Sequence, residues 1–149
     1  MGHGDLSRGE KNQLAVASAT LGPWRTAAGA GALVGSAALG VNVVTGHWGA
    51  DVVAGPAGLG LFVLFLVGTL GGKLRRDAAD RRIHRWAAEH PWRSALPASA
   101  AFWLLNTVNL TFLGGTELFE SLFSSLAPAG LLLVVAGVVG SVKRSRRTR

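Results

Sequence analysis

Residues 51–76 read DVVAGPAGLGLFVLFLVGTLGGKLRR, an apolar run that ends in a basic cluster. From Val52 to Gly72 no side chain carries a charge. A helix over this run rises roughly 30 Å at 1.5 Å per residue, which matches the hydrocarbon core of a bilayer. The stretch therefore predicts a transmembrane helix that is followed by cations on the cytoplasmic side.

Three other stretches of the 149-residue chain have the same apolar character. The chain is 49% hydrophobic and only 15% charged, and the charges gather in a few short segments instead of covering a whole surface. We place the four spans at residues 26–45, 52–72, 95–113 and 119–142. The predicted fold is therefore all-α, a polytopic membrane protein with four transmembrane helices arranged as two helical hairpins.

The basic residues predict the orientation of these helices. All 15 Lys and Arg lie outside the two short turns at residues 46–51 and 114–118. Because loops that contain Lys and Arg resist translocation, both termini are predicted to lie in the cytoplasm. The bias toward Ala, Gly and Arg is typical of a GC-rich bacterium, so the predicted location is a bacterial plasma membrane. The chain divides into a cytoplasmic N-terminal tail (1–23), a first transmembrane hairpin (24–72), a basic amphipathic cytoplasmic loop (73–93), a second hairpin (94–142) and a basic cytoplasmic tail (143–149).

Two of the spans have unusual compositions. The first is rich in Gly and Ala between Ala27 and Gly40, which permits close approach of a neighbouring backbone, so we expect it to be the most buried helix. The fourth contains Pro128, so we expect this helix either to kink there or to begin there. Tryptophans near the predicted boundaries, at positions 24, 48, 86 and 92, are typical of side chains that anchor helix ends at the lipid headgroups.

The two halves of the chain share a sequence pattern. PAGLGLFVLFLVGTL begins at Pro56 and PAGLLLVVAGVVGSV begins at Pro128, with several residues identical at equal offsets. A Val-Asn pair precedes each, at residues 41–42 and 108–109. We interpret the halves as copies of one hairpin, related by an axis along the membrane normal because both copies begin on the cytoplasmic side.

This hairpin resembles the bacterial two-transmembrane-helix domain family, over residues 39–72 and more faintly over 105–142. The resemblance lies in the Val-Asn pair, a short turn with Trp48 and the Pro-Ala-Gly-Leu-Gly-Leu start of the second helix. The sequence lacks the family's His and Tyr in the first helix and has residues 58–60, Gly-Leu-Gly, in place of Gly-Trp-Gly. Similarity to this family implies membrane anchoring or a signalling context, and it implies no known chemistry.

The basic loop, KLRRDAADRRIHRWAAEHPWR at residues 73–93, reads as an amphipathic interfacial helix with Ala79, Ile83 and Trp86 on one face. Its arginines either set the topology and attract anionic lipid headgroups or form a docking site for an acidic cytoplasmic partner. We do not expect nucleic-acid binding, because no stacking platform or groove-reading motif accompanies the charge. The candidate lipid or partner contacts are Arg75, Arg76, Arg81, Arg82 and Arg85.

Intramembrane amides are the other candidate functional groups. Asn106 and Asn109 lie three residues apart on one helix face of the most polar span, and Asn42 lies in the first span. These amides either hydrogen-bond across helix interfaces or line a small polar pathway. A proton-coupled transporter is not favoured, because no ionisable residue is predicted at the midplane.

The sequence predicts no catalytic, cofactor or metal site. There is no cysteine and no nucleophile elbow or phosphate-binding loop. On the outer side, His47, Asp51, Glu117 and Glu120 either bind a divalent cation or belong to ordinary polar turns, and their spacing specifies no metal geometry. We therefore expect an accessory, interaction or regulatory membrane component, with a membrane protein or a second copy as its partner. The alternatives are an oligomeric channel or small transporter and, third, a lipid-active interfacial enzyme.

Overall fold

The computed structural model describes residues 8–20, 22–46, 48–49, 51–74, 86–87 and 89–145. The secondary-structure elements in this part of the chain are all α-helices, which confirms the predicted all-α class. The five labelled helices are α1 (Arg8–Thr20), α2 (Trp24–Val44), α3 (Asp51–Leu74), α5 (Pro91–Phe112) and α6 (Leu118–Ser145).

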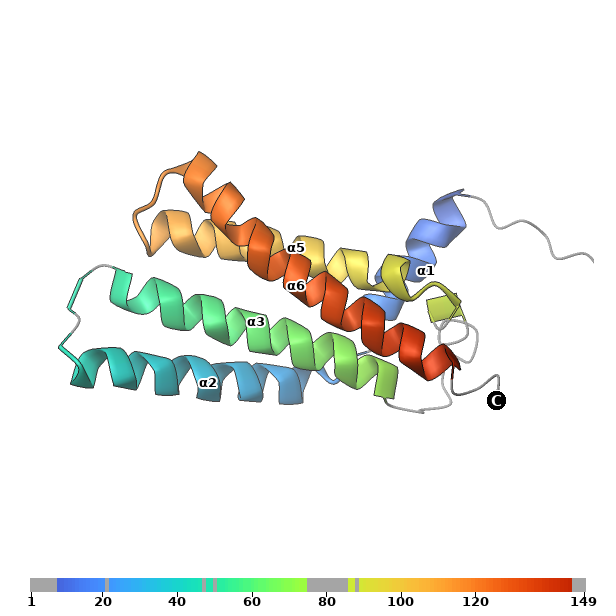
Figure 1. Cartoon of the computed structure of the whole chain (residues 1–149), viewed down its shortest axis with the longest axis horizontal. Coiled ribbons are helices and arrows are strands. Elements are labelled where there is room, and N and C mark those ends of the chain that lie inside the picture. Colours follow the sequence, from blue (N-terminus) through green and yellow to red (C-terminus); the bar gives the residue numbers. More distant parts are fainter. Residues whose placement is uncertain are drawn as a thin grey trace, which may run out of the picture.

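The helices pack as two neighbouring pairs, α2 with α3 and α5 with α6 (Figure 1). Helix α3 joins the pairs because it contacts both α5 and α6. The turns within the two pairs lie at the same end of the bundle, at the left of Figure 1, and α1 lies at the other end against α5. Gly46 and Gly115 have φ of +79° and +64° in these turns, a conformation that other residues rarely adopt.

Three of the described helices are both long and apolar enough to cross a membrane: α2, residues 52–71 of α3, and residues 118–142 of α6. The sequence predicted four such helices, but only three of the described helices meet this criterion: the expected span 95–113, which overlaps α5 up to Phe112, does not. Length is not the reason, since α5 has 22 residues. Its polarity is the reason, because the expected span contains Ser99, Asn106, Thr107, Asn109 and Thr111.

Close backbone contact joins α2 to α3. A Cβ atom added at Gly31 would lie 2.5 Å from the carbonyl oxygen of Gly60, and one added at Gly35 would lie 3.1 Å from that of Pro56. The expected close approach therefore occurs, but the expectation that α2 is the most buried helix was wrong. Only 11% of the apolar stretch of α2 is buried, against 33% of that of α3 and 28% of that of α6. The reason is position, since α2 lies at the edge of the bundle and packs mainly on α3.

Prolines lie inside three of the helices without ending them. Helix α6 begins ten residues before Pro128 and continues through it, so this helix does not begin at the proline. In α3, Pro56 has no N–H to donate to the carbonyl of Val52, four residues earlier. Asn42 on α2 donates its Nδ2 hydrogen to that carbonyl oxygen at 3.1 Å. One predicted intramembrane amide thus compensates for a proline in the neighbouring helix.

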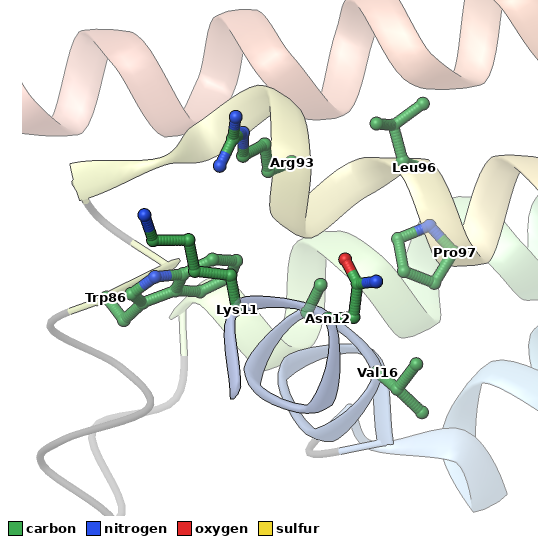
Figure 2. A pocket seen from close by; sticks show the side chains of 8 residues that line it. Lys11, Asn12, Val16, Trp86, Arg93, Leu96 and Pro97 are labelled. Carbon is green, nitrogen blue, oxygen red and sulfur yellow. The ribbon is translucent and has the colours of Figure 1, made fainter. Parts of the chain in front are cut away.

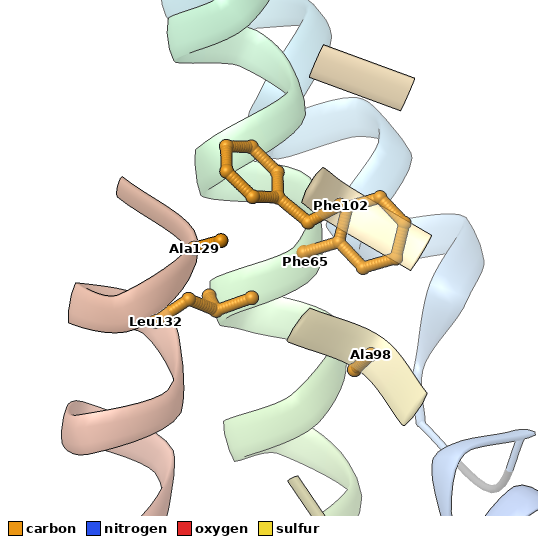
Figure 3. Packing of buried hydrophobic residues seen from close by; sticks show 5 residues of the cluster. All are labelled: Phe65, Ala98, Phe102, Ala129 and Leu132. Carbon is orange, nitrogen blue, oxygen red and sulfur yellow. The ribbon is translucent and has the colours of Figure 1, made fainter. Parts of the chain in front are cut away.

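An aromatic and aliphatic cluster forms the core where α3, α5 and α6 meet (Figure 3). The rings of Phe65 and Phe102 pack edge to face with centroids 6.0 Å apart, and Trp24 packs on Phe65 in the same way at 5.7 Å. Leu132 from α6 is fully buried against them. This core lies near the middle of the three helices.

The first 23 residues, predicted as a tail, contain a helix. α1 has 13 residues and packs against α5 and, less extensively, α3. One face of α1 carries Lys11, Asn12, Ala15 and Val16, since Lys11 and Ala15, like Asn12 and Val16, are four residues apart. This contact makes the N-terminal segment part of the bundle.

Candidate functional site

A cluster of hydroxyl and amide side chains lies between α5, α6 and α3 at the end of the bundle that holds the two turns. Asn106 and Asn109 are 6% and 7% exposed, and Ser121 and Ser125 are fully buried. Buried polar groups of this kind are stable only where they find hydrogen-bond partners. We call these residues the α5–α6 polar cluster; its members are Asn106, Asn109, Thr111, Thr116, Ser121 and Ser125.

The two asparagines of α5 bind different neighbours. Asn106 donates from Nδ2 to Oγ of Ser125 on α6 at 3.1 Å. Asn109 donates from Nδ2 to the carbonyl oxygen of Ala54 on α3 at 2.8 Å. One amide therefore holds α5 to its partner α6, and the other connects the α5–α6 pair to the α2–α3 pair.

The cluster extends toward the turn between α5 and α6. Thr111 donates to Oγ of Ser121 at 2.9 Å, and the Ser121 hydroxyl lies 2.6 Å from Oγ1 of Thr116. Thr116 in turn donates to the carbonyl oxygen of Leu110 at 3.0 Å. The hydroxyls thus fix the turn to both helices.

Gly58 on α3 provides the space that the asparagines occupy. A Cβ atom at this position would lie 2.8 Å from Oδ1 of Asn106 and 3.4 Å from Nδ2 of Asn109. Gly58 belongs to the Pro-Ala-Gly-Leu-Gly-Leu motif that carries the family resemblance. Sequence reasoning did not connect this glycine to the asparagines, although two small-residue positions in an apolar span are a signal for close packing.

Two buried polar atoms have no hydrogen-bond partner among the described residues, Oδ1 of Asn109 and Oγ of Ser99. Leaving such a group unpaired costs about 1–3 kcal/mol. Phe102 lies between these two residues along α5 and is 1% exposed. The polar cluster is therefore separated from Ser99 by the aromatic core.

The other predicted site residues do not join this cluster. Asn42 bonds to Val52 within the α2–α3 pair. The five arginines of the basic loop (75, 76, 81, 82 and 85) and His47 lie outside the described residues. Glu117 and Glu120 are exposed, and the described part of the chain contains no group of three His, Cys, Asp or Glu residues placed to hold a metal ion.

A second candidate site is a groove of about 780 Å³ between α1 and the start of α5, which we call the α1–α5 groove (Figure 2). Lys11 and Arg93 contribute cations, and Val16, Leu96 and Pro97 contribute an apolar surface. Trp86, which is 6% exposed, lines the groove. Sequence reasoning missed this site because it assigned no structure to the segment that forms α1.

The indole of Trp86 is held in place by the residue that precedes α5. Its ring stacks on His90 with centroids 5.1 Å apart and an angle of 19° between the planes. The backbone N–H of His90 donates to the carbonyl oxygen of Trp86 at 2.9 Å. Trp86 therefore forms a wall of the groove next to the start of α5.

Comparisons with known proteins identify no relative. No protein-family model matches the chain, and neither a curated protein nor a solved structure matches it. The resemblance to the two-transmembrane-helix domain family therefore stays a prediction, and the geometry of the bundle itself carries the functional inference.

Proposed function

We propose that this protein is a non-catalytic accessory component of a bacterial plasma membrane, which associates through α2 with a transmembrane helix of a partner protein. The exposed face of α2 is the observation that carries this proposal. Helix α2 is 21 residues long and mainly apolar, yet only 11% of its apolar stretch is buried. A helix at the edge of a bundle with an exposed apolar face is available for lateral contact within the bilayer.

The exposed face of α2 lies opposite its contact with α3. Its small residues recur at intervals of three and four, so they form one stripe along the helix. A Cβ atom added at Gly29 or Gly40 would have no neighbour within 4 Å. We call this surface the outer α2 face; it includes the small residues Gly29, Ala32, Ser36 and Gly40 and, beside them, Leu33, which is 75% exposed.

Helix α5 crosses the membrane as a fourth helix in this proposal. Its two asparagines are turned toward α6 and α3, where Asn106 and Asn109 form hydrogen bonds. Its outer surface is apolar, with Leu104, Val108 and Phe112 at least half exposed. Average hydropathy counts polar residues equally whether they face lipid or protein. A helix whose polar residues face protein therefore fails the hydropathy criterion for a membrane span, although its lipid-facing surface is apolar.

The positions of the charged residues in the described part of the chain support an arrangement with both termini in the cytoplasm. Lys11, Arg25 and Arg93 lie on α1 or at the starts of α2 and α5, at one end of the bundle. Glu117 and Glu120 lie at the other end, at the start of α6. Because Lys and Arg are retained on the cytoplasmic side, the end with α1 is the cytoplasmic one in this proposal.

The channel alternative receives less support from the packing. The polar cluster occupies only the half of the bundle near the turns, and Phe102 and Leu132 are buried on its cytoplasmic side. A pathway through one copy would have to pass this core. The hydrogen bonds of Asn106 and Asn109 to Ser125 and Ala54 are those expected of groups that fix helix packing.

Enlarging the outer α2 face tests the proposal. Gly29→Leu places a branched side chain on this face, and Gly130→Leu is a matched control because a Cβ at Gly130 on α6 also meets nothing within 4 Å. Each variant is extracted from its native membrane into nanodiscs, and the mass and composition of the intact particle are measured. We expect Gly29→Leu to lose the stoichiometric partner and Gly130→Leu to retain it. A wild-type particle that contains one copy and no other protein would contradict the proposal.

A further inference from the structure

The α1–α5 groove has a charged end and an apolar end (Figure 2). Lys11 and Arg93 lie toward the side where Trp86 stands, and Val16, Leu96 and Pro97 lie toward the other. The same order holds along each helix. Leu96 follows Arg93 by three residues, or about 4.5 Å along α5, and Val16 follows Lys11 by five residues, or about 7.5 Å along α1.

This order matches the depth profile of a bilayer. Arg93 lies in the first turn of α5, at the end of the bundle where the charges gather, and Leu96 lies farther toward the bundle centre. Phosphate groups of lipids lie at the surface and acyl chains lie below them. A groove whose cations are outermost and whose aliphatic side chains are deeper therefore presents each part of a lipid with a matching surface.

The cations of the groove are available to a ligand. Lys11 is partly exposed and Arg93 is exposed, and both line the groove. Arg binds phosphate with a planar fork of donors, and Lys binds it as a point charge. The neighbouring amide of Asn12 adds a neutral donor to the lining.

We propose that the α1–α5 groove binds one anionic phospholipid of the cytoplasmic leaflet. The phosphate lies between Lys11 and Arg93, Trp86 borders the headgroup, and an acyl chain follows Val16 and Leu96. This inference rests on the membrane embedding proposed above and does not depend on association through the outer α2 face.

The size and lining of the groove favour a lipid over a free phosphate ion. About 780 Å³ is within the range of sites that hold organic ligands of drug size, and it is far larger than one phosphate needs. An ion would leave the apolar surface of Val16, Leu96 and Pro97 in contact with water. A lipid covers that surface with its own chain, which is favourable for each methylene group removed from water.

The test is a lipid titration of the delipidated full-length protein in detergent, with bound lipids counted by native mass spectrometry. The probe is palmitoyl-oleoyl phosphatidylglycerol, and the matching phosphatidylcholine measures the contribution of the headgroup charge. We expect one tightly bound phosphatidylglycerol. Since a basic residue near the membrane surface contributes about 1 kcal/mol, the double variant Lys11→Gln, Arg93→Gln should bind it about 30-fold more weakly.

Arg25→Gln is the matched control, because Arg25 is an exposed cation at the same end of the bundle and does not line the groove. It should keep wild-type affinity. An equal loss of phosphatidylglycerol affinity in Arg25→Gln and in the double variant would overturn the proposal, because lipid binding would then depend only on the total charge of the protein. Unchanged binding in the double variant, or equal affinity for phosphatidylcholine, would overturn it as well.

A second variant tests the apolar end and guards against misfolding of the first. Leu96→Asn keeps both cations and should weaken phosphatidylglycerol binding, and soluble sn-glycerol 3-phosphate should compete poorly against the lipid in the wild-type protein. Equal competition by the soluble phosphate would overturn the lipid assignment. Gly29→Leu should bind lipid like the wild type, so failure of partner association and failure of lipid binding are distinguished by separate variants.

Discussion

The hydrogen bond from Asn42 to Val52 should matter only because Pro56 lies four residues after Val52. In a regular helix the N–H of residue 56 would donate to the Val52 carbonyl, and proline has none. Asn42 donates in its place at 3.1 Å from a partly buried site. Asn42→Ala should therefore lower the free energy of unfolding by about 1 kcal/mol, within the range of about 0.6–2 kcal/mol for hydrogen bonds between membrane helices.

The same substitution should cost almost nothing in a Pro56→Ala background, since the backbone N–H gained at position 56 restores the regular helical bond. A double-mutant cycle isolates this coupling from the packing that Pro56→Ala itself removes. The assay is reversible unfolding of the purified protein in mixed micelles, followed by circular dichroism. A coupling free energy of about 1 kcal/mol is expected. An equal cost of Asn42→Ala in both backgrounds would refute the argument that the asparagine compensates for the proline.

Two further experiments test the helix interfaces in the same unfolding assay. Gly31→Ala should destabilise the protein by about 1–3 kcal/mol, because its Cβ would lie 2.5 Å from the Gly60 carbonyl oxygen. Gly29→Ala is the control, because its Cβ meets nothing within 4 Å, and it should not destabilise the protein. Equal changes in stability for the two variants would show that the contact between Gly31 and Gly60 is not tight. The double variant Asn106→Ala, Asn109→Ala should lose about 1–4 kcal/mol of stability, and a loss of ion flux in proteoliposomes with stability unchanged would instead favour the channel alternative.

The sequence predicted the positions of the helices well where apolar runs end at charges or turns. The run 52–72 became α3, Asp51–Leu74, and the run 26–45 became α2, Trp24–Val44. It did not predict α1, because a helix of 13 largely polar residues depends on tertiary contact with α5 and has no long apolar run of its own.

Burial could not be deduced from composition. Small residues on α2 correctly indicated close contact, but they occur both at the α3 interface, as Gly31, and on the exposed face, as Gly29. Which face is covered depends on the arrangement of the helices. For the same reason the sequence placed Asn106 and Asn109 on one helix face but did not reveal their partners, since Ala54 is 55 residues from Asn109.

The internal duplication stays a prediction, and the structure adds similarities and one difference between the halves. Thr69 and Ser141, at equal offsets after the two prolines, each donate to the carbonyl oxygen four residues earlier, at 2.6 and 2.9 Å. The Val-Asn pairs differ in their partners, because Asn42 bonds within its own helix pair and Asn109 bonds across to the other. If the halves arose from one hairpin, the second has acquired the contact that joins them.

Site-specific photocrosslinking in native membranes tests the central claim most directly. A photoreactive amino acid replaces Ser36 in the middle of the outer α2 face, and in the control it replaces Leu104, which is 56% exposed in the middle of α5. The proposed function predicts one discrete protein adduct from position 36 and only lipid adducts from position 104. Adducts of equal yield from both positions, or none from position 36, would contradict association through α2.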